Sequence, residues 1–274
     1  MSQPPRDRVM AEPETASLFG LGSDGADRPV PLAGRELLVR VIDEDPDLGS
    51  MLDAERLAAA RRSVRAREVR LDRGPWEYFP QPQPGDLGSL ILDGFVLVCV
   101  GIPRREHYEL MGPGDVVSPW IVDDGTLSVA PLVTATVLTE MRLAHLERAF
   151  TLQIAHLPEV SAALVHRLIM RARRLSLQAA VNGIPKISDR LAMTLWHLAE
   201  RYGHVTPDGI RLSLPVTHAQ LAGITASQRP SITSALKQLR TAGVVERTPD
   251  RSWLLRGEPP ADLEQLARQA GLAS

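Results

Sequence analysis

The part of the sequence that most constrains the fold is a pair of short amphipathic helices expected between residues 217 and 243. Thr217 can cap the first helix, and Gln220 three residues later completes the pattern of a capping box. Pro230 suits the first turn of the second helix, where a missing N–H costs no hydrogen bond. The second helix is predicted to bury one stripe at helical spacing, formed by Ile232, Ala235, Leu236 and Leu239. Two short helices joined by a tight turn form a helix-turn-helix.

Short strands flank this pair of helices. Residues 209–215 alternate between apolar and polar side chains, as a strand with one buried face does. Residues 244–247 and 252–255 stand on either side of the turn 248–251, a pattern typical of a β-hairpin. The order strand, helix, turn, helix, hairpin therefore predicts a winged helix-turn-helix.

The charge distribution favours a nucleic-acid partner for this segment. The whole chain carries a formal net charge of −2, which excludes a protein coated uniformly with basic residues. Between residues 229 and 256, however, six side chains are basic and two are acidic. In a major groove, the side chains closest to base edges would be Arg229, Ser231, Thr233 and Ser234. The DNA phosphates would be held by Thr217, Lys237, Arg247 and Arg251.

The sequence before residue 150 has the pattern of strands and turns that is typical of a β-domain. Residues 63–143 hold many short β-rich runs separated by glycine, proline and aspartate turns, which favours a sandwich or jelly roll. Asp93-Gly94 lies between two apolar runs and predicts a hairpin. Just upstream, apolar residues at helical spacing predict a helix over Asp47 to Ala60, capped by Asp47.

Two longer helices are predicted between the β-region and the helix-turn-helix. The first covers residues 158–183 and carries an apolar seam of Val165, Leu168, Ala172, Leu175 and Ala179. That seam fits either a helix lying on its own domain or a helix shared across a dimer interface. The arginines at 167, 171, 173 and 174 lie on its other sides, and those from Arg171 to Arg174 are interpreted as a solvated face. The second helix follows Pro185, with Ser188 as its expected cap.

These features together resemble the Crp/Fnr family of bacterial transcription regulators, over residues 47–253. The likeness is strongest in the segment Leu221-Ala-Gly-Ile-Thr-Ala-Ser-Gln-Arg-Pro-Ser-Ile-Thr-Ser-Ala-Leu-Lys-Gln-Leu, which is similar to the family's helix-turn-helix. Leu87 to Val98 and Met111 to Asp115 resemble two turns of its cyclic-nucleotide-binding domain. The resemblance implies an α+β fold: an N-terminal β jelly roll, a long dimerisation helix and a C-terminal winged helix-turn-helix.

The sequence departs from the family pattern at two functional positions. Where the family's recognition helix begins Ser-Arg-Glu and carries a second Arg, this chain has Gln228, Arg229, Pro230 and Ser234, so only Arg229 carries over as a base-reading arginine. Where the family has Arg-Thr-Ala to pair the cyclic phosphate, this chain has Val133-Thr134-Ala135. A buried phosphate without its arginine is uncompensated. We therefore expect no usual binding of cyclic AMP, no certain cofactor and no metal, while a different small effector stays open.

The sequence thus predicts five regions: a disordered tail (1–34), a cyclic-nucleotide-binding-like jelly roll (35–157), a connecting and dimerisation helix (158–183), a winged helix-turn-helix (184–260) and a C-terminal helix or tail (261–274). The leading hypothesis is a cytoplasmic, homodimeric regulator on palindromic double-stranded DNA, nucleoid-associated when bound. The resemblance also allows contact with RNA polymerase. The alternative is a ligand-sensing or partner-docking module whose winged domain contacts protein. The sequence contains no catalytic motif and no apolar run as long as a membrane span. Cys99 is the one cysteine, which excludes a disulfide framework within one chain.

Overall fold

The computed structural model describes residues 37–76, 83–102, 105–117, 131–250 and 252–259. The predicted tail at 1–34, the C-terminal segment 261–274 and the predicted phosphate contact Arg251 lie outside the described residues. All described residues belong to one compact unit, Glu36–Ser274. Among them, no helix is long and apolar enough to cross a membrane.

The chain begins with elements that only partly match the predicted helix at 47–60. A short strand β1 (Leu38–Arg40) leads into α1 (Val41–Glu44), a 3-10 turn (Pro46–Gly49) and α2 (Ala54–Ser63). The cap of α2 is Asp53, whose carboxylate accepts a hydrogen bond from the Arg56 N–H at 2.9 Å, and not Asp47. The apolar spacing that predicted one helix runs across the gap between the 3-10 turn and α2. Leu48 in that turn and Leu52 just before α2 are both buried although they do not belong to one helix.

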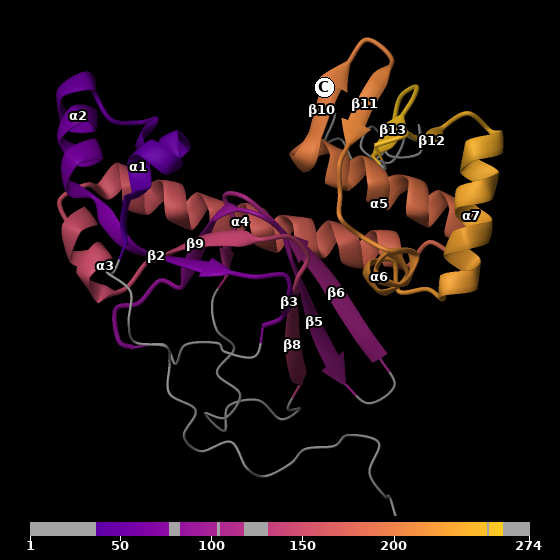
Figure 1. Cartoon of the computed structure of the whole chain (residues 1–274), viewed down its shortest axis with the longest axis horizontal. Coiled ribbons are helices and arrows are strands. Elements are labelled where there is room, and N and C mark those ends of the chain that lie inside the picture. Colours follow the sequence, from indigo (N-terminus) through magenta and orange to yellow (C-terminus); the bar gives the residue numbers. More distant parts are fainter. Residues whose placement is uncertain (1–36, 77–82, 103–104, 118–130, 251, 260–274) are drawn as a thin grey trace, which may run out of the picture. The chain divides into compact units, whose positions relative to one another are not determined.

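Two antiparallel sheets form the β-domain (Figure 1). The five-stranded sheet has the order β1-β2-β9-β4-β7, and the four-stranded sheet has the order β3-β8-β5-β6. Their remaining strands are β2 (Arg65–Leu71), β3 (Gly74–Pro75), β4 (Ser89–Asp93), β5 (Val96–Ile102), β6 (Arg105–Met111), β7 (Val116–Val117), β8 (Leu132–Val137) and β9 (Met141–His145). The predicted jelly-roll-like class is confirmed.

The chain turns at Asp93-Gly94 as predicted, but the two strands that flank the turn do not pair with each other, so the predicted hairpin is wrong. β4 pairs with β7 and β9, whereas β5 pairs with β6 and β8, so the chain crosses from one sheet to the other at this turn. Gly94 has φ of +88°, and a Cβ there would lie 2.3 Å from the Glu140 carbonyl oxygen. The Asp-Gly pair encodes a reversal of direction, but long-range burial between the sheets decides which strands pair.

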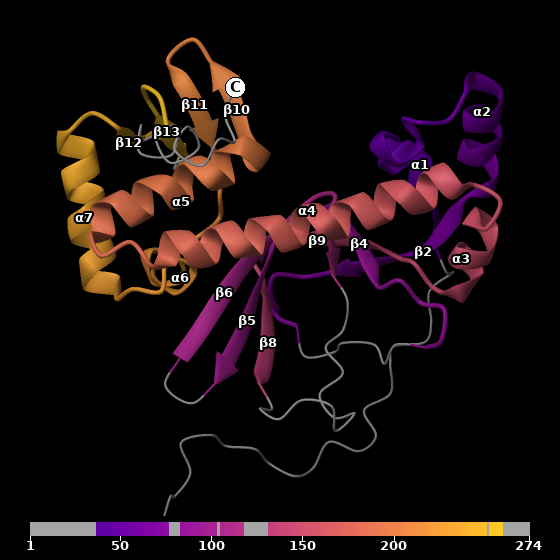
Figure 2. The same cartoon turned by 180° about the vertical axis from the view of Figure 1, so that it is seen from behind.

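The helices follow the β-domain in the predicted order. They are α3 (Arg148–Ile154), α4 (Pro158–Asn182) and α5 (Ile187–Tyr202). α4 is one unbroken helix, and its whole length can be followed in Figure 2, which views the molecule from the opposite side. Ser188 does not cap α5: the cap is Lys186, which makes no side-chain hydrogen bond to the helix, and Ser188 is buried within the first turn.

The C-terminal part packs three helices on a small sheet. α6 (His218–Ile224) and α7 (Arg229–Thr241) lie with α5, and the sheet has the order β10-β11-β13-β12. Its strands are β10 (Gly203–Thr206), β11 (Gly209–Leu212), β12 (Val245–Arg247) and β13 (Trp253–Leu255). Leu195, Leu212 and Ile232 are fully buried where the helices meet the sheet.

Candidate nucleic-acid interface

Local sequence signals explain why α6 and α7 form. The Thr217 hydroxyl accepts from the Gln220 N–H at 3.2 Å, and the Gln220 side chain accepts from the Thr217 N–H at 2.8 Å. This reciprocal pair is the predicted capping box. Pro230 lies in the first turn of α7, as predicted. The predicted stripe of α7 is buried, and each of its larger side chains contributes about 2 kcal/mol of transfer free energy.

The turn between the two helices holds a strained residue. Ala226 has φ of +46° and is the one described residue other than glycine with positive φ. A left-handed backbone at a residue with a Cβ costs roughly 1–2 kcal/mol. Neighbouring hydrogen bonds hold the turn: the Thr225 hydroxyl donates to the Leu221 carbonyl at 2.7 Å, and the Ser227 N–H donates to the Ala222 carbonyl at 2.8 Å.

The outward face of α7 carries most of the predicted DNA-contact residues. Arg229, Thr233, Ser234 and Lys237 are exposed, and Ser231 is half-buried. None of these side chains belongs to the buried stripe, which faces α5 and the sheet. The backbone therefore presents polar side chains along one side of the helix, at the length and spacing that a major groove accepts.

The wing adds a second side to this face. β12 and β13 form the predicted antiparallel hairpin, with Val245 opposite Leu255. The Arg247 guanidinium lies over the Trp253 ring, 4.1 Å from its centroid, which is a cation–π contact. Exposed Thr217, at the start of α6, completes the set of predicted phosphate contacts that the structure describes.

These elements enclose a groove of about 700 Å³. We call it the basic groove. The residues that line it are Val216, Thr217, His218, Thr233, Ser234, Leu236, Lys237, Arg240, Val245, Arg247 and Trp253. Three of these side chains are cationic at neutral pH, and none of the described lining residues is acidic. The sequence prediction missed His218, Arg240 and Trp253, although the helical face of Lys237 also contains Arg240.

The acids near the wing are neutralised by partners outside the basic groove. Glu246 pairs with Arg256 at 2.8 Å, and Asp250 lies 3.7 Å from Arg211. Hydrogen bonds from Thr248 and Ser252 lower the pKa of Asp250 to about 2, so it stays ionised at neutral pH. The local positive charge on the groove side is therefore not cancelled by these two carboxylates.

Comparison with known proteins shows the same architecture. A model of the Crp-like helix-turn-helix domain matches residues 189–271. A CRP-like cAMP-activated global transcriptional regulator from Mycobacterium tuberculosis is 29% identical over 196 residues, covering 70% of this chain and 83% of the relative. A CRP-family transcriptional regulator from Thermus thermophilus is 25% identical with a TM-score of 0.51, covering 74% of this chain and 96% of that structure. The chain is therefore similar to a CRP-like regulator over most of its length, and its C-terminal part matches the Crp-like helix-turn-helix domain.

A further solved structure shows the same fold. A CooA mutant from Carboxydothermus hydrogenoformans is 20% identical, with a TM-score of 0.55 over 75% of this chain and 88% of that chain. The comparisons thus confirm the resemblance to CRP-like regulators seen in the sequence, and they support a transcription regulator with a DNA-binding helix-turn-helix. The relatives are transcription regulators and not enzymes.

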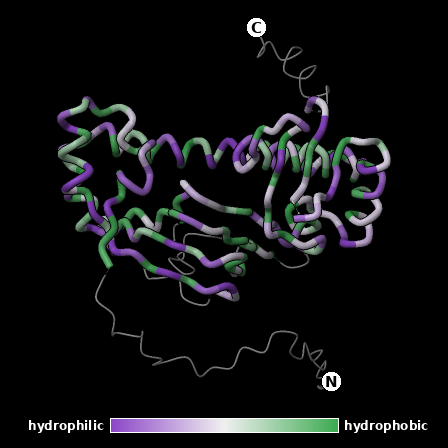
Figure 3. The backbone as a smooth tube through the Cα atoms, turned by 45° about the horizontal axis from the view of Figure 1, so that its top comes forward, coloured by the Kyte–Doolittle hydropathy of each residue, from purple (hydrophilic) through white to green (hydrophobic). Residues whose placement is uncertain are grey.

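Helix α4 of the regulator has two unlike faces. Val165, Leu168 and Ile169 are exposed by 54%, 47% and 47%, and Ala172 and Ala179 are exposed as well. Leu175, the fifth residue of the predicted seam, is half-buried, and Ile169, which the prediction did not include, lies on the same side of the helix. Figure 3 shows hydrophobic and hydrophilic stretches alternating along the helices. Most of the apolar seam is therefore not covered by the described part of its own chain.

The opposite face of α4 corrects the interpretation of its arginines as solvated. Arg167 forms an ion pair with Asp45, Arg171 with Glu109 at 2.7 Å, and Arg174 with Asp115 at 3.0 Å. Of the three arginines interpreted as solvated, Arg173 alone is exposed. The acidic partners come from segments more than fifty residues away, so local sequence did not indicate them.

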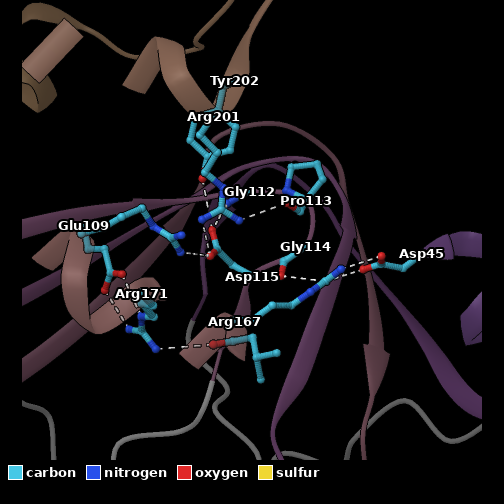
Figure 4. A network of polar contacts seen from close by, with 12 residues as sticks. Asp45, Glu109, Gly112, Pro113, Gly114, Asp115, Arg167, Arg171, Arg201 and Tyr202 are labelled. Carbon is cyan, nitrogen blue, oxygen red and sulfur yellow. Dashed lines mark hydrogen bonds and ion pairs between the residues drawn. The ribbon is translucent and has the colours of Figure 1, made fainter. Parts of the chain in front are cut away.

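Asp115 gathers four donors in the turn that resembles the family's Pro-Gly-Asp motif (Figure 4). Its side chain is 5% exposed. It accepts from the Gly112 N–H at 3.0 Å and from the Tyr202 hydroxyl at 3.1 Å, and it pairs with Arg174 and with Arg201 at 2.6 Å. Burial is the main cause that raises the pKa of Tyr202, so this phenol stays a hydrogen-bond donor. One carboxylate thus links the β-domain turn to α4 and α5.

Proposed function

We propose that this regulator binds palindromic DNA as a homodimer and inserts α7 into a major groove. The observation that carries this proposal is the outward face of α7: Arg229, Thr233, Ser234 and Lys237 are exposed, while the apolar stripe is buried. Arg229 reads guanine, with Ser231, Thr233 and Ser234 near neighbouring bases. Thr217, Lys237, Arg247 and Arg251 hold phosphates. Such a protein works in the cytoplasm at the nucleoid, and its proposed function needs no catalytic step.

The apolar seam of α4 supports the homodimer. Val165, Leu168 and Ile169 leave about half of their surface uncovered on one side of a 25-residue helix. Two copies of such a helix cover each other's seams when they pack about a two-fold axis. A two-fold dimer places two α7 helices on one face of the duplex, about one helical turn apart. Contact with RNA polymerase stays a prediction of the family resemblance.

Selection of bound duplexes from a random pool tests this function directly. The full chain, immobilised by a tag, is incubated with a random double-stranded library and the bound fraction is sequenced after several rounds. We expect an inverted repeat whose half-sites are spaced by about one turn of the helix, roughly 10 base pairs. Failure to enrich any sequence, with recovery of a protein partner instead, would favour the partner-docking alternative.

We also propose that the β-domain does not bind cyclic AMP in the usual way. Val133 is half-buried against the apolar core of the jelly roll, in the place of the arginine that the family uses. Arg167, Arg171 and Arg174 are already neutralised by carboxylates, so none of them is available for a phosphate without losing its partner. Calorimetric titration with cyclic AMP should give no binding heat. Saturable binding would overturn this part of the proposal, and a different small effector stays open.

A further inference from the structure

His218 occupies a position in the basic groove that the DNA-contact set above does not use. It is the first residue of α6, and its side chain is half-buried among groove residues. Its Nδ1 atom lies 3.3 Å from the Thr233 Oγ1 atom on α7. Its ring faces the Trp253 ring at 6.5 Å between centroids, tilted by 34°. The imidazole is therefore positioned by α6, α7 and the wing at once.

The hydrogen bonds around Thr233 favour one tautomer of the imidazole. The Thr233 hydroxyl donates to the Arg229 carbonyl at 3.2 Å, one helical turn earlier. The Thr233 oxygen is then left to accept, so His218 Nδ1 carries a hydrogen and donates to it. The second nitrogen, Nε2, has a lone pair when the ring is neutral and an N–H donor when the ring is protonated.

Several cations surround this ring in the free protein. Lys237 and Arg240 from α7 and Arg247 from β12 line the same groove, and Arg229 at the start of α7 also acts on the ring. No described acid lines the groove. Burial, then Arg247 and Arg229, lower the pKa of His218 below its ordinary value. Without DNA, the ring is neutral at pH 7.

A duplex reverses this electrostatic environment. A phosphate seated between Lys237 and Arg247 neutralises the cations and adds negative charge beside the imidazole. The protonated ring then gains a charge-assisted hydrogen bond from Nε2 to a phosphate oxygen. Because Nδ1 is already held by Thr233, the ring needs little reorientation to make that bond.

We propose that His218 is a phosphate-contacting residue that takes up a proton when the regulator binds DNA. This inference rests on the proposed function and deepens it. Proton uptake on binding makes affinity rise as pH falls, by at most tenfold per pH unit for one proton. It also adds one cation to the interface at low pH, which steepens the salt dependence by about 0.9 in the slope of log affinity against log salt.

The test measures DNA affinity of the full chain by fluorescence anisotropy at constant ionic strength between about pH 6 and pH 8, the range in which a histidine changes charge. The probe is a fluorescent duplex carrying the sequence that the selection enriches. We expect wild-type affinity to rise about tenfold from the upper to the lower end of this range. His218→Gln keeps an N–H for Thr233 but cannot be charged, so its affinity should vary less than about twofold. His204→Gln, an exposed histidine on β10 outside the groove, should behave like wild type.

A second measurement uses the wild-type protein alone. The imidazole proton signals are titrated by NMR with and without the duplex, and the signal absent from His218→Gln identifies the residue. We expect its pKa to rise on DNA binding. A flat wild-type pH profile, an equal pH slope in His218→Gln, or an unchanged pKa would overturn the inference while leaving DNA binding intact. Absence of binding to any duplex at any pH would instead refute the proposed function.

Discussion

Dimerisation through α4 can be tested by one charge in the apolar seam. Val165, Leu168 and Ile169 are each about half exposed. Full burial of such a side chain contributes about 1.5–3 kcal/mol, so covering the exposed half contributes about 1 kcal/mol each. In a two-fold dimer every side chain counts twice, which gives about 6 kcal/mol from these three residues. The substitution Leu168→Glu removes a third of that and places two carboxylates at the symmetric contact.

The expected penalty is large enough to measure. Losing about 2 kcal/mol of apolar contact and desolvating two carboxylates at about 1 kcal/mol each raises the dissociation constant roughly a thousandfold. Sedimentation velocity over a dilution series measures this constant. Leu152→Glu is the matched control, since Leu152 is 64% exposed on α3, outside the seam. A Leu168→Glu dimer whose dissociation constant stays close to that of wild type, or a wild-type protein that binds DNA as a monomer, would refute the assignment of the interface.

Three further predictions concern stability. Asp115→Ala leaves two arginines without their carboxylate and should lower the free energy of unfolding, measured by urea denaturation, by about 3 kcal/mol. Asp43→Ala removes an exposed ion pair and should change this free energy by less than about 0.5 kcal/mol. Ala226→Gly relieves a left-handed backbone and should raise the midpoint of thermal unfolding, whereas Ala219→Gly inside α6 should lower it. Burial lowers the pKa of His145, so the unfolded chain binds the proton first and stability should fall as pH drops below about 6.5, less so in His145→Gln. Equal pH dependence in both proteins would count against that cause.

Local signals were sufficient to predict the helix-turn-helix. The capping residues at 217 and 220, the proline at 230 and the apolar stripe of α7 all act within one or two helical turns. The wing was predictable for the same reason, because a turn of polar residues separates two short apolar runs. The basic groove was only partly predicted: His218 follows its cap directly, but nothing local shows that α7 and the wing lie on either side of it.

Long-range contacts account for the errors. The turn at Asp93-Gly94 was recognisable, but the partners of β4 and β5 are chosen by burial between two sheets. The arginines of α4 lie at helical spacing opposite the apolar seam, a pattern that indicates a second face. Their partners Asp45, Glu109 and Asp115 come from loops and strands far along the chain, so spacing alone favoured a solvated surface.

The most direct test of DNA reading by α7 compares two substitutions on two duplexes. Anisotropy titrations use the selected duplex and a shuffled duplex of the same composition, over a range of salt concentrations. Arg229→Ala should lower the preference for the selected duplex by about 1–3 kcal/mol. Lys237→Ala should weaken binding to both duplexes equally and reduce the slope of log affinity against log salt concentration by about 0.9. If Arg229→Ala leaves the ratio of the two affinities unchanged, α7 does not read the sequence.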